Sequence, residues 1–289
     1  MMEKQVVLVT DSTADIPRTL IEELGIYVIP LKVHFDGETF LDGESITPPL
    51  FYQKVSQVRE LPTTSQPSPL DFVSLYERIV EEHPGSHIVS IHLSGALSGT
   101  VQSAHIAREM VAGKIPVTVI DSKKASYAIG IIVVAAAEKA KKGVPVDPLL
   151  QYAWDLVGNT HVYFMVDTLH HLQKGGRIGR AQAIVGTLLN VKPILSLDEM
   201  GQVYAKEKAR GEKKALQRIL ELLQQEAKRY HKIRLGISHA DVPERANEVR
   251  EMLEKTFPGA PIVVTEIGAV IGTHVGKGTV AIALAPDEE

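Results

Sequence analysis

The stretch from His92 to Ala104 brings together residue types that bind anions. It reads HLSGALSGTVQSA and follows the apolar run from His87 to Ile91, a pattern that predicts a strand ending in a Ser/Gly loop that opens a helix. Such a junction gathers free backbone N–H groups, hydroxyl donors and the positive end of a helix dipole at one point. It therefore suits a phosphate or a carboxylate.

Two further segments are candidates for the same site. Residues 62–67 read PTTSQP, and this predicted hydroxyl-rich loop would supply more donors if the fold brings it near the first loop. His274 lies in GTHVGKG, a predicted glycine-rich loop before the final strand, and loops carry many functional residues. Between Lys174 and Arg218 stand ten basic residues against four acidic ones, which favours docking of an acidic partner or a phosphate group there.

Serine hydrolysis is the first enzyme class to test, with Ser94 or Ser98 as the nucleophile and His274 as the base. A nucleophile elbow needs G-x-S-x-G so that the serine stands on a strained turn, whereas residues 95–99 read GALSG. Neither serine begins an S-x-x-K pair either. The spacing therefore argues against a hydrolase of this type.

Nucleotide and metal chemistry also match the sequence poorly. The chain has no G-x-x-x-x-G-K-[ST] phosphate loop, and no G-x-G-x-x-G follows the first predicted strand. His170 and His171 are adjacent on a predicted helix, so their side chains diverge, and there is no cysteine to complete a zinc site. Asp11 and Asp15 lack a third ligand at suitable spacing, and we predict turn formation for them, with Asp15 as the N-cap of the first helix.

A binding protein is the remaining class that these residues suit. Its polar loops would hold the head of a ligand, and its apolar helices would enclose the body. Burying one methylene group is worth roughly 0.8 kcal/mol, so the tail of a long acyl chain contributes on the order of 10 kcal/mol. A few neutral donors then suffice for a carboxylate. Residues 128–137 and 183–197 are apolar enough to enclose such a tail.

The first half of the chain alternates short apolar strands with helices. This alternation predicts an α/β fold, with a parallel sheet, right-handed crossovers and helices on both faces. The run AIGIIVVAAA is predicted as part of a buried helix that ends before Gly143. The predicted strands are residues 6–10, 26–31, 87–91 and 117–120, and the predicted helices are residues 51–58, 69–83, 100–111 and about 126–142.

The second half is predicted to form a mixed α/β domain. A boundary is placed within residues 147–159, which divides the chain into an N-terminal domain of residues 1–158 and a C-terminal domain of residues 159–289. No linker or internal repeat separates them, so close packing is expected. The predicted elements are strands at 162–166, 233–238 and 262–267, a hairpin of 192–197 with 202–206, and helices after GGRIG and at 211–230 and 243–255.

Composition restricts the function classes further. The chain has 289 residues, 44% of them hydrophobic, no cysteine and a net charge of −4. This charge argues against non-specific nucleic-acid binding as the main activity. The longest apolar run has ten residues, too short to span a bilayer, and the N-terminus lacks the apolar region of a signal peptide. We therefore expect a soluble cytoplasmic protein.

Five motifs occur in order along the chain: VTDSTAD, TTSQPSP, LSGALSGTVQSA, LQKGGRIGRAQAIVGTLLNVKPIL and EIGAVIGTHVGKGTVAIAL. Together they resemble the DegV family of bacterial fatty-acid-binding proteins over essentially the whole chain. The resemblance implies a two-domain α/β protein, with residues 5–285 as one unit and a long-chain fatty acid such as palmitate buried between the domains. It implies no catalytic activity, no cofactor and no metal.

The resemblance also implies which residues hold the carboxylate. Thr64, the second threonine of TTSQP, would donate to it, with Thr63 beside it. Where the family has a serine pair, this chain reads Ser94-Gly95, so Ser94, Ser98 or the Gly95 amide would complete the head-group site. Arg177 of GGRIG and His274 of GTHVGKG match positions that neutralise and orient the carboxylate.

A partner is implied as well: a separate fatty acid kinase that phosphorylates the bound carboxylate to an acyl phosphate for phospholipid synthesis. We predict that Arg210, with Lys206 and Lys208, helps to dock this kinase. The alternative is a hydrolase or transferase that acts on an acyl or phosphorylated small molecule at the same loops.

Overall fold

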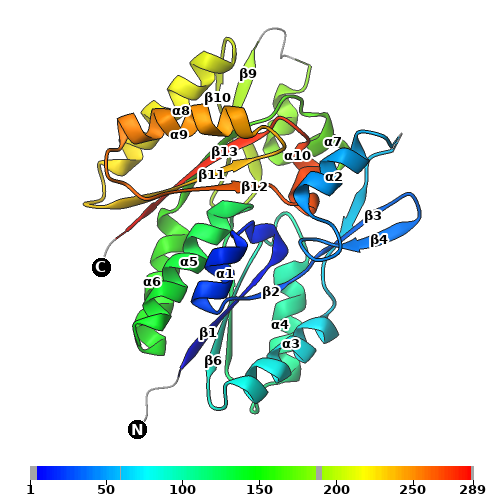
Figure 1. The fold of residues 1–289 in the computed structure, drawn as a ribbon, viewed down its shortest axis with the longest axis vertical. Helices are drawn as coiled ribbons and strands as arrows, with labels where there is room; N and C mark the ends of the chain where they lie inside the picture. The colour runs from blue at the N-terminus through cyan, green and yellow to red at the C-terminus, as the bar shows by residue number, and fades with distance from the viewer. Residues whose placement is uncertain (1–4, 59, 187–190, 288–289) are drawn as a thin grey trace.

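The computed structural model describes residues 5–58, 60–186 and 191–287. Its lower half in Figure 1 is built on a parallel sheet of order β2-β1-β6-β7. The strands are β1 (Val6–Asp11), β2 (Tyr27–Ile29), β6 (His87–His92) and β7 (Val117–Asp121). Each strand is followed by a helix or a crossover, as the alternation in the sequence predicts.

Helices cover both faces of this parallel sheet. One face carries α3 (Pro69–Glu82) and α4 (Thr100–Met110), and the other carries α1 (Arg18–Leu24) and α5 (Tyr127–Lys141), with α6 (Val146–Asn159) beside α5. Alternate residues of β1 point to the two sides: Val7 and Val9 pack with α3 and α4, whereas Val6 and Leu8 pack with α5. Burial on both faces explains the continuous apolar run of this strand.

The upper half is a six-stranded mixed sheet of order β10-β9-β8-β13-β11-β12. Only β11 and β12 pair in parallel, and the other neighbours are antiparallel. Helices α8 (Glu212–Ala227) and α9 (Pro243–Thr256) cover its outer face. The strands are β8 (His161–Met165), β9 (Lys192–Leu197), β10 (Val203–Ala209), β11 (Ile233–His239), β12 (Ile262–Glu266) and β13 (Val280–Pro286).

Helix α5 lies between the two large sheets and contacts β1 on one side and β11 and β13 on the other. Residues 127–137 are all buried, because an apolar surface all round suits a helix enclosed on every side. The predicted buried helix is therefore confirmed. The chain passes from the first large sheet to the second between α6 and β8, next to the predicted boundary at residue 158. The division into two domains stays a prediction.

A third, antiparallel sheet of order β4-β3-β5 lies beside the other two. Its strands are β3 (Lys32–Phe35), β4 (Glu38–Leu41) and β5 (Thr63–Ser65), and α2 (Pro48–Val55) and α10 (Ala269–Val275) lie nearby. The remaining short helices are α7 (His170–Lys174) and the 3₁₀ turns η1 (Ser12–Ala14) and η2 (Gly179–Ile184). No helix in the described ranges is long and apolar enough to cross a membrane.

Four local predictions were wrong. Residues 63–65 of the PTTSQP segment form β5 rather than a loop, because they pair with β3. His274 lies in α10 rather than in a loop. Asp15 does not cap α1: it adopts a left-handed conformation after η1, and α1 begins after Pro17.

The fourth error concerns residues 26–31, which do not form a single strand. Only residues 27–29 join the parallel sheet, after which the chain crosses to β3.

The apolar helix predicted after GGRIG is observed only as the turn η2, and part of its predicted length, residues 187–190, lies outside the described residues.

Candidate ligand-binding site

A pocket lies between the loops of the parallel sheet and the inner face of the mixed sheet. Its cavity volume is about 80 Å³, below the roughly 300–1,000 Å³ of small-molecule sites, so the lining side chains must move apart to admit a large ligand. Both halves of the chain contribute to its lining: Leu93 and Ser98 follow β6, whereas Phe164 belongs to β8. A ligand here would be held between the two sheets.

The polar end of the pocket is formed by residues far apart in sequence. Thr64 Oγ1 on β5 lies 2.9 Å from His274 Nε2 on α10. Arg177 lies beside this pair, and its guanidinium donates from Nε to Leu97 O at 3.1 Å and from Nη1 to Gly175 O at 2.6 Å. Two backbone carbonyls thus hold the arginine in place while its positive charge remains at the pocket.

His274 is held in its neutral form. Burial lowers its pKa to about 4, with further lowering by the charges of Arg177 and His171. Its Nδ1 is buried without a partner among the described residues, so a proton is better placed on Nε2, where Thr64 accepts it. The Thr64 hydroxyl is then free to donate its own proton to a ligand oxygen.

Gly175 makes room for this imidazole. A Cβ atom built on Gly175 would lie 2.3 Å from His274 Nδ1, far inside van der Waals contact. Close packing therefore requires the first glycine of the KGGR segment. Because this glycine directly follows α7, the contact fixes the position of α7 relative to His274.

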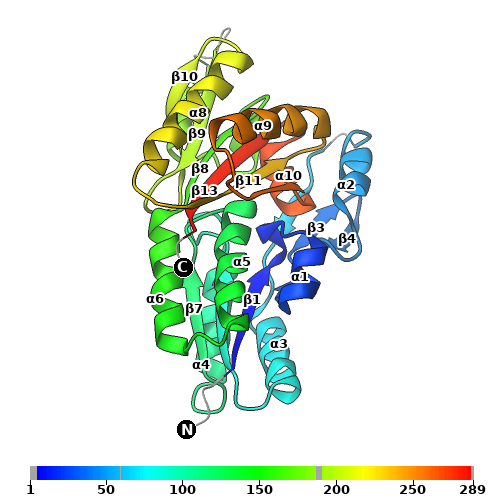
Figure 2. The same ribbon diagram turned by 60° about the vertical axis from the view of Figure 1, so that its left-hand side comes forward.

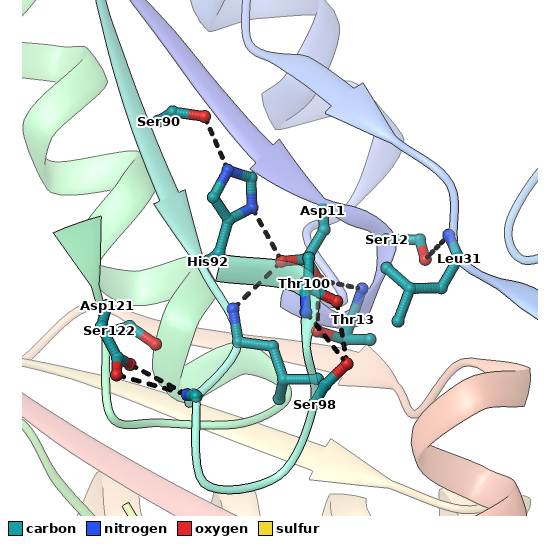
Figure 3. A network of polar contacts seen from close by, with 12 residues as sticks. Asp11, Ser12, Thr13, Leu31, Ser90, His92, Ser98, Thr100, Asp121 and Ser122 are labelled. Carbon is teal, nitrogen blue, oxygen red and sulfur yellow. Dashed lines mark hydrogen bonds and ion pairs between the residues drawn. The ribbon is translucent and has the colours of Figure 1, made fainter. Parts of the chain in front are cut away.

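Other polar side chains surround the same end of the pocket. Ser98 Oγ lies 2.9 Å from Thr100 Oγ1 at the start of α4 (Figure 3), so the hydroxyl also serves the helix entry. Ser65 and Gln66 line the pocket too, and Ser65 is hydrogen-bonded to His34 at 2.8 Å. Neither residue was predicted as a site residue, although both belong to the hydroxyl-rich PTTSQP segment, which was a usable signal.

Three predicted head-group residues lie outside the pocket lining. Ser94 is fully buried, and its hydroxyl donates to Gly201 O at 3.0 Å. The Gly95 amide donates toward both carboxylate oxygens of Asp121 at 3.3 Å. Thr63 is exposed on β5. The structure thus brings Thr64, Ser98, Arg177 and His274 together and directs Ser94, Gly95 and Thr63 elsewhere; a carboxylate contact for any of the seven stays a prediction.

The body of the pocket is apolar. Its walls include Leu97, Phe164, Leu172, Ile271 and Val275, which present aliphatic and aromatic surface without charge. Burial of a hydrocarbon chain against such walls is favourable at roughly 0.8 kcal/mol per methylene group. The arrangement of one polar end and an apolar body suits an amphipathic ligand.

Ser126 is a lining residue that no sequence pattern indicated. It precedes α5 with φ +53°, and its hydroxyl donates to the buried carboxylate of Asp15. Asp15 in turn accepts from the Gly268 amide at 2.9 Å, and Asp42 accepts from the Ala269 amide at 2.9 Å. The two carboxylates therefore hold the start of α10, the helix that carries His274.

Burial governs the charge of this pair of carboxylates. Desolvation raises the pKa of Asp15 well above its usual value and the pKa of Asp42 to about 6. The hydrogen bonds from Ser126 and Gly268 to Asp15 only partly oppose this effect. Both groups consequently favour their protonated form more than an exposed aspartate does.

A second polar network resembles a catalytic triad in composition. His92 Nδ1 lies 2.9 Å from Asp11 Oδ2, and His92 Nε2 lies 2.6 Å from Ser90 Oγ (Figure 3). All three side chains are fully buried, and Ser90 also contacts the hydroxyl of Tyr76 at 2.9 Å. With its serine enclosed in the core, this network ties β1 to β6 and does not support the hydrolase alternative.

The predicted docking residues lie at the edge of the mixed sheet. Lys206 and Lys208 are exposed on the edge strand β10, and the exposed Arg210 follows this strand. No group of three or more metal-ligating side chains occurs in the described part of the chain.

Comparisons with known proteins place these features in a family. The family model described as "Uncharacterised protein, DegV family" matches residues 5–287. A DegV domain-containing protein of Listeria innocua is 38% identical over 97% of this chain and 98% of its own.

Two solved structures are similar over nearly their entire length. One is described as fatty acid binding of a DegV family protein from Thermus thermophilus, with 42% identity, coverage of 98% of this chain and 99% of that one, and a TM-score of 0.89. The other is DegV, a fatty acid binding protein from Bacillus subtilis, with 38% identity, coverage of 98% and 100%, and a TM-score of 0.90.

Proposed function

This chain belongs to the DegV family, and we propose that it binds one long-chain fatty acid in the pocket between its sheets. The observation that carries the proposal is the pocket itself, with Thr64, His274 and Arg177 at one end and apolar walls beyond them. The fatty-acid binding of the similar Thermus and Bacillus proteins supports it.

The carboxylate would lie at the polar end. Thr64 donates a hydrogen bond to one oxygen, because its own acceptor site is used by His274. Arg177 supplies positive charge within a partly desolvated site, where an ion pair is stronger than in water. The tail extends along Phe164 and Val162 toward α5, and no step in this binding requires bond making or breaking.

Native mass spectrometry of the purified protein tests the proposal. The expected result is one fatty acid per chain, either retained from the expression host or acquired after incubation with palmitate, and released by solvent extraction. A chain that stays ligand-free after incubation with both palmitate and oleate would contradict it. The fatty acids recovered also measure which tail the pocket prefers.

The finer proposal is that the protein presents the bound carboxylate to a fatty acid kinase in the cytoplasm. The exposed cations Arg210, Lys206 and Lys208 would attract a kinase surface or its nucleotide. Reversing the charge with Arg210→Glu should lower the rate of acyl phosphate formation by the kinase while the fatty acid content of the protein is unchanged. An unaltered rate would refute a docking role for Arg210.

A further inference from the structure

A second groove runs along α5, between this helix and the edge strand β12, and the proposed fatty-acid site does not use it. This α5 groove has a volume of about 390 Å³. Its apolar surface comes from Leu20 on α1, Ile131 and Val134 on α5, and Val263 on β12. The fatty-acid pocket instead contacts Ala125 and Ser126, just before α5 begins, so the two cavities adjoin different parts of the helix.

Tyr127 places a hydroxyl group at the α5 groove. The tyrosine is 1% exposed, and its ring lies against Gly236, where an added Cβ would approach Tyr127 Cδ1 to 2.3 Å. Among the described residues, none is hydrogen-bonded to its hydroxyl. The hydroxyl is not one of the fully enclosed side-chain atoms that lack a partner, and Tyr127 lines the groove, so this donor is placed to meet a ligand or a water molecule.

The rim of the α5 groove is positively charged. Arg234 pairs with Glu138 at 2.9 Å and with Asp287, so its charge balances one of the two negative charges of the lining. The remaining cations include Lys142 and Lys139, whose Nζ lies 5.1 Å from the centre of the Tyr152 ring. The described residues of the lining include four basic side chains against two acidic ones, and this balance favours an anion.

We propose that the α5 groove is a second binding site, for an amphipathic anion. The apolar body of the ligand packs against Ile131, Val134 and Val263. The Tyr127 hydroxyl hydrogen-bonds to a polar atom of the ligand inside the groove, and its acidic group lies near Lys139 and Lys142 at the rim. This proposal stands independently of fatty-acid binding between the sheets.

The probe for this site is 8-anilino-1-naphthalenesulfonate, which combines an apolar body with one sulfonate. The protein is first incubated with palmitate, and probe fluorescence is then titrated at low ionic strength while native mass spectrometry counts the palmitate retained. We expect the probe to bind without releasing palmitate. Tyr127→Phe, which keeps the ring on Gly236, should raise the probe Kd about 2- to 10-fold, the range for one lost hydrogen bond.

Charge reversal at the rim gives a second, independent variant. Lys142→Glu should raise the probe Kd about threefold or more at low salt and less at high salt, because salt screens exposed charges. Lys114→Glu is the matched control: Lys114 is exposed after α4 and is not part of the groove lining, so the same change in net charge should leave the Kd unaltered.

Three results would overturn the proposal: no probe binding, loss of the last palmitate from a protein that holds only one in step with probe binding, or wild-type Kd values for both Tyr127→Phe and Lys142→Glu. If the protein takes up no palmitate, the fatty-acid proposal fails. The probe Kd values of the variants then still test whether the α5 groove is a binding site. A second palmitate that is lost in Tyr127→Phe would support an acyl anion as the occupant. Probe binding with only one palmitate would support another class of amphipathic anion.

Discussion

The hydroxyl of Thr64 offers the sharpest test of the head-group site. Thr64→Val keeps the shape and the β-branched side chain on β5 but removes the hydroxyl that contacts His274 and can donate to the ligand carboxylate. A hydrogen bond to a charged group is worth about 1.5–3 kcal/mol. Because each 1.4 kcal/mol is a factor of ten in affinity, the Kd for palmitate should rise about 10- to 150-fold.

Calorimetric titration of delipidated protein with palmitate measures this change directly. Two control variants separate the hydroxyl from other effects. Thr63→Val alters the exposed neighbour on the same strand and should change the Kd less than about twofold, as expected for a side chain without a ligand contact. Thr64→Ser restores the hydroxyl and should recover most of the affinity.

The refuting result is equally specific. If Thr64→Val binds palmitate as tightly as the wild type, or if Thr63→Val loses as much affinity, the carboxylate is not held by Thr64. A loss of thermal stability in Thr64→Val without a change in Kd would indicate that the pair with His274 is purely structural.

Three further changes follow from the geometry. Gly175→Ala should destabilise the fold by about 1–3 kcal/mol, because the new methyl group presses on His274. The control Gly158→Ala has open space around it on α6 and should stabilise the fold by about 0.5–1 kcal/mol. Equal melting temperatures of the two variants would contradict the close packing of Gly175 against His274. Burial raises the pKa of Asp42 to about 6 from its usual value of 3.8, so its contribution to stability is lost as pH rises from about 4 through 6. In urea unfolding, Asp42→Asn should therefore gain stability relative to wild type as the pH rises from about 4 to about 6. A constant difference between the two proteins would exclude this. Ala283→Leu enlarges a residue that packs with Ala128 and Val162 beside the tail end of the pocket, so competition binding should show palmitate weakened more than laurate, and an unchanged preference would mean that the tail ends elsewhere.

Local pattern was sufficient for most of the fold. The strands of both large sheets and the long helices were predictable because apolar periodicity and capping residues act over a few neighbours. Ser68, for example, caps α3 through its side chain and Asp71. The two Asp-Gly steps in residues 35–49 predicted a hairpin or a loop, and β3 and β4 form a hairpin at the first of them. Strand β5 was missed because it is three residues long and gains its stability from pairing with β3. His274 was misplaced for a related reason: its glycine-rich surroundings are typical of a loop, yet they pack as α10 against α2 and α7.

The sequence indicated the residue types of the candidate site, whereas the tertiary structure decided which residues belong to it. Thr64, Arg177 and His274 were named from motifs that the family resemblance made meaningful. Ser94 came from the same kind of motif, but the structure buries its hydroxyl against Gly201, because a loop of the first sheet meets the β9–β10 hairpin there. Gln66 and Ser126 joined the pocket only when distant strands and helices were brought together.

By itself, the sequence determined that this chain forms an α/β fold with a buried central helix, since these properties follow from patterns within ten or twenty residues. Only the tertiary structure decided which polar groups meet. Thr64 and His274 lie 210 positions apart, and Tyr127 reaches the α5 groove because Gly236 leaves room for its ring. Such meetings depend on how whole sheets and helices pack, and that information is spread over the entire chain rather than held in any one segment.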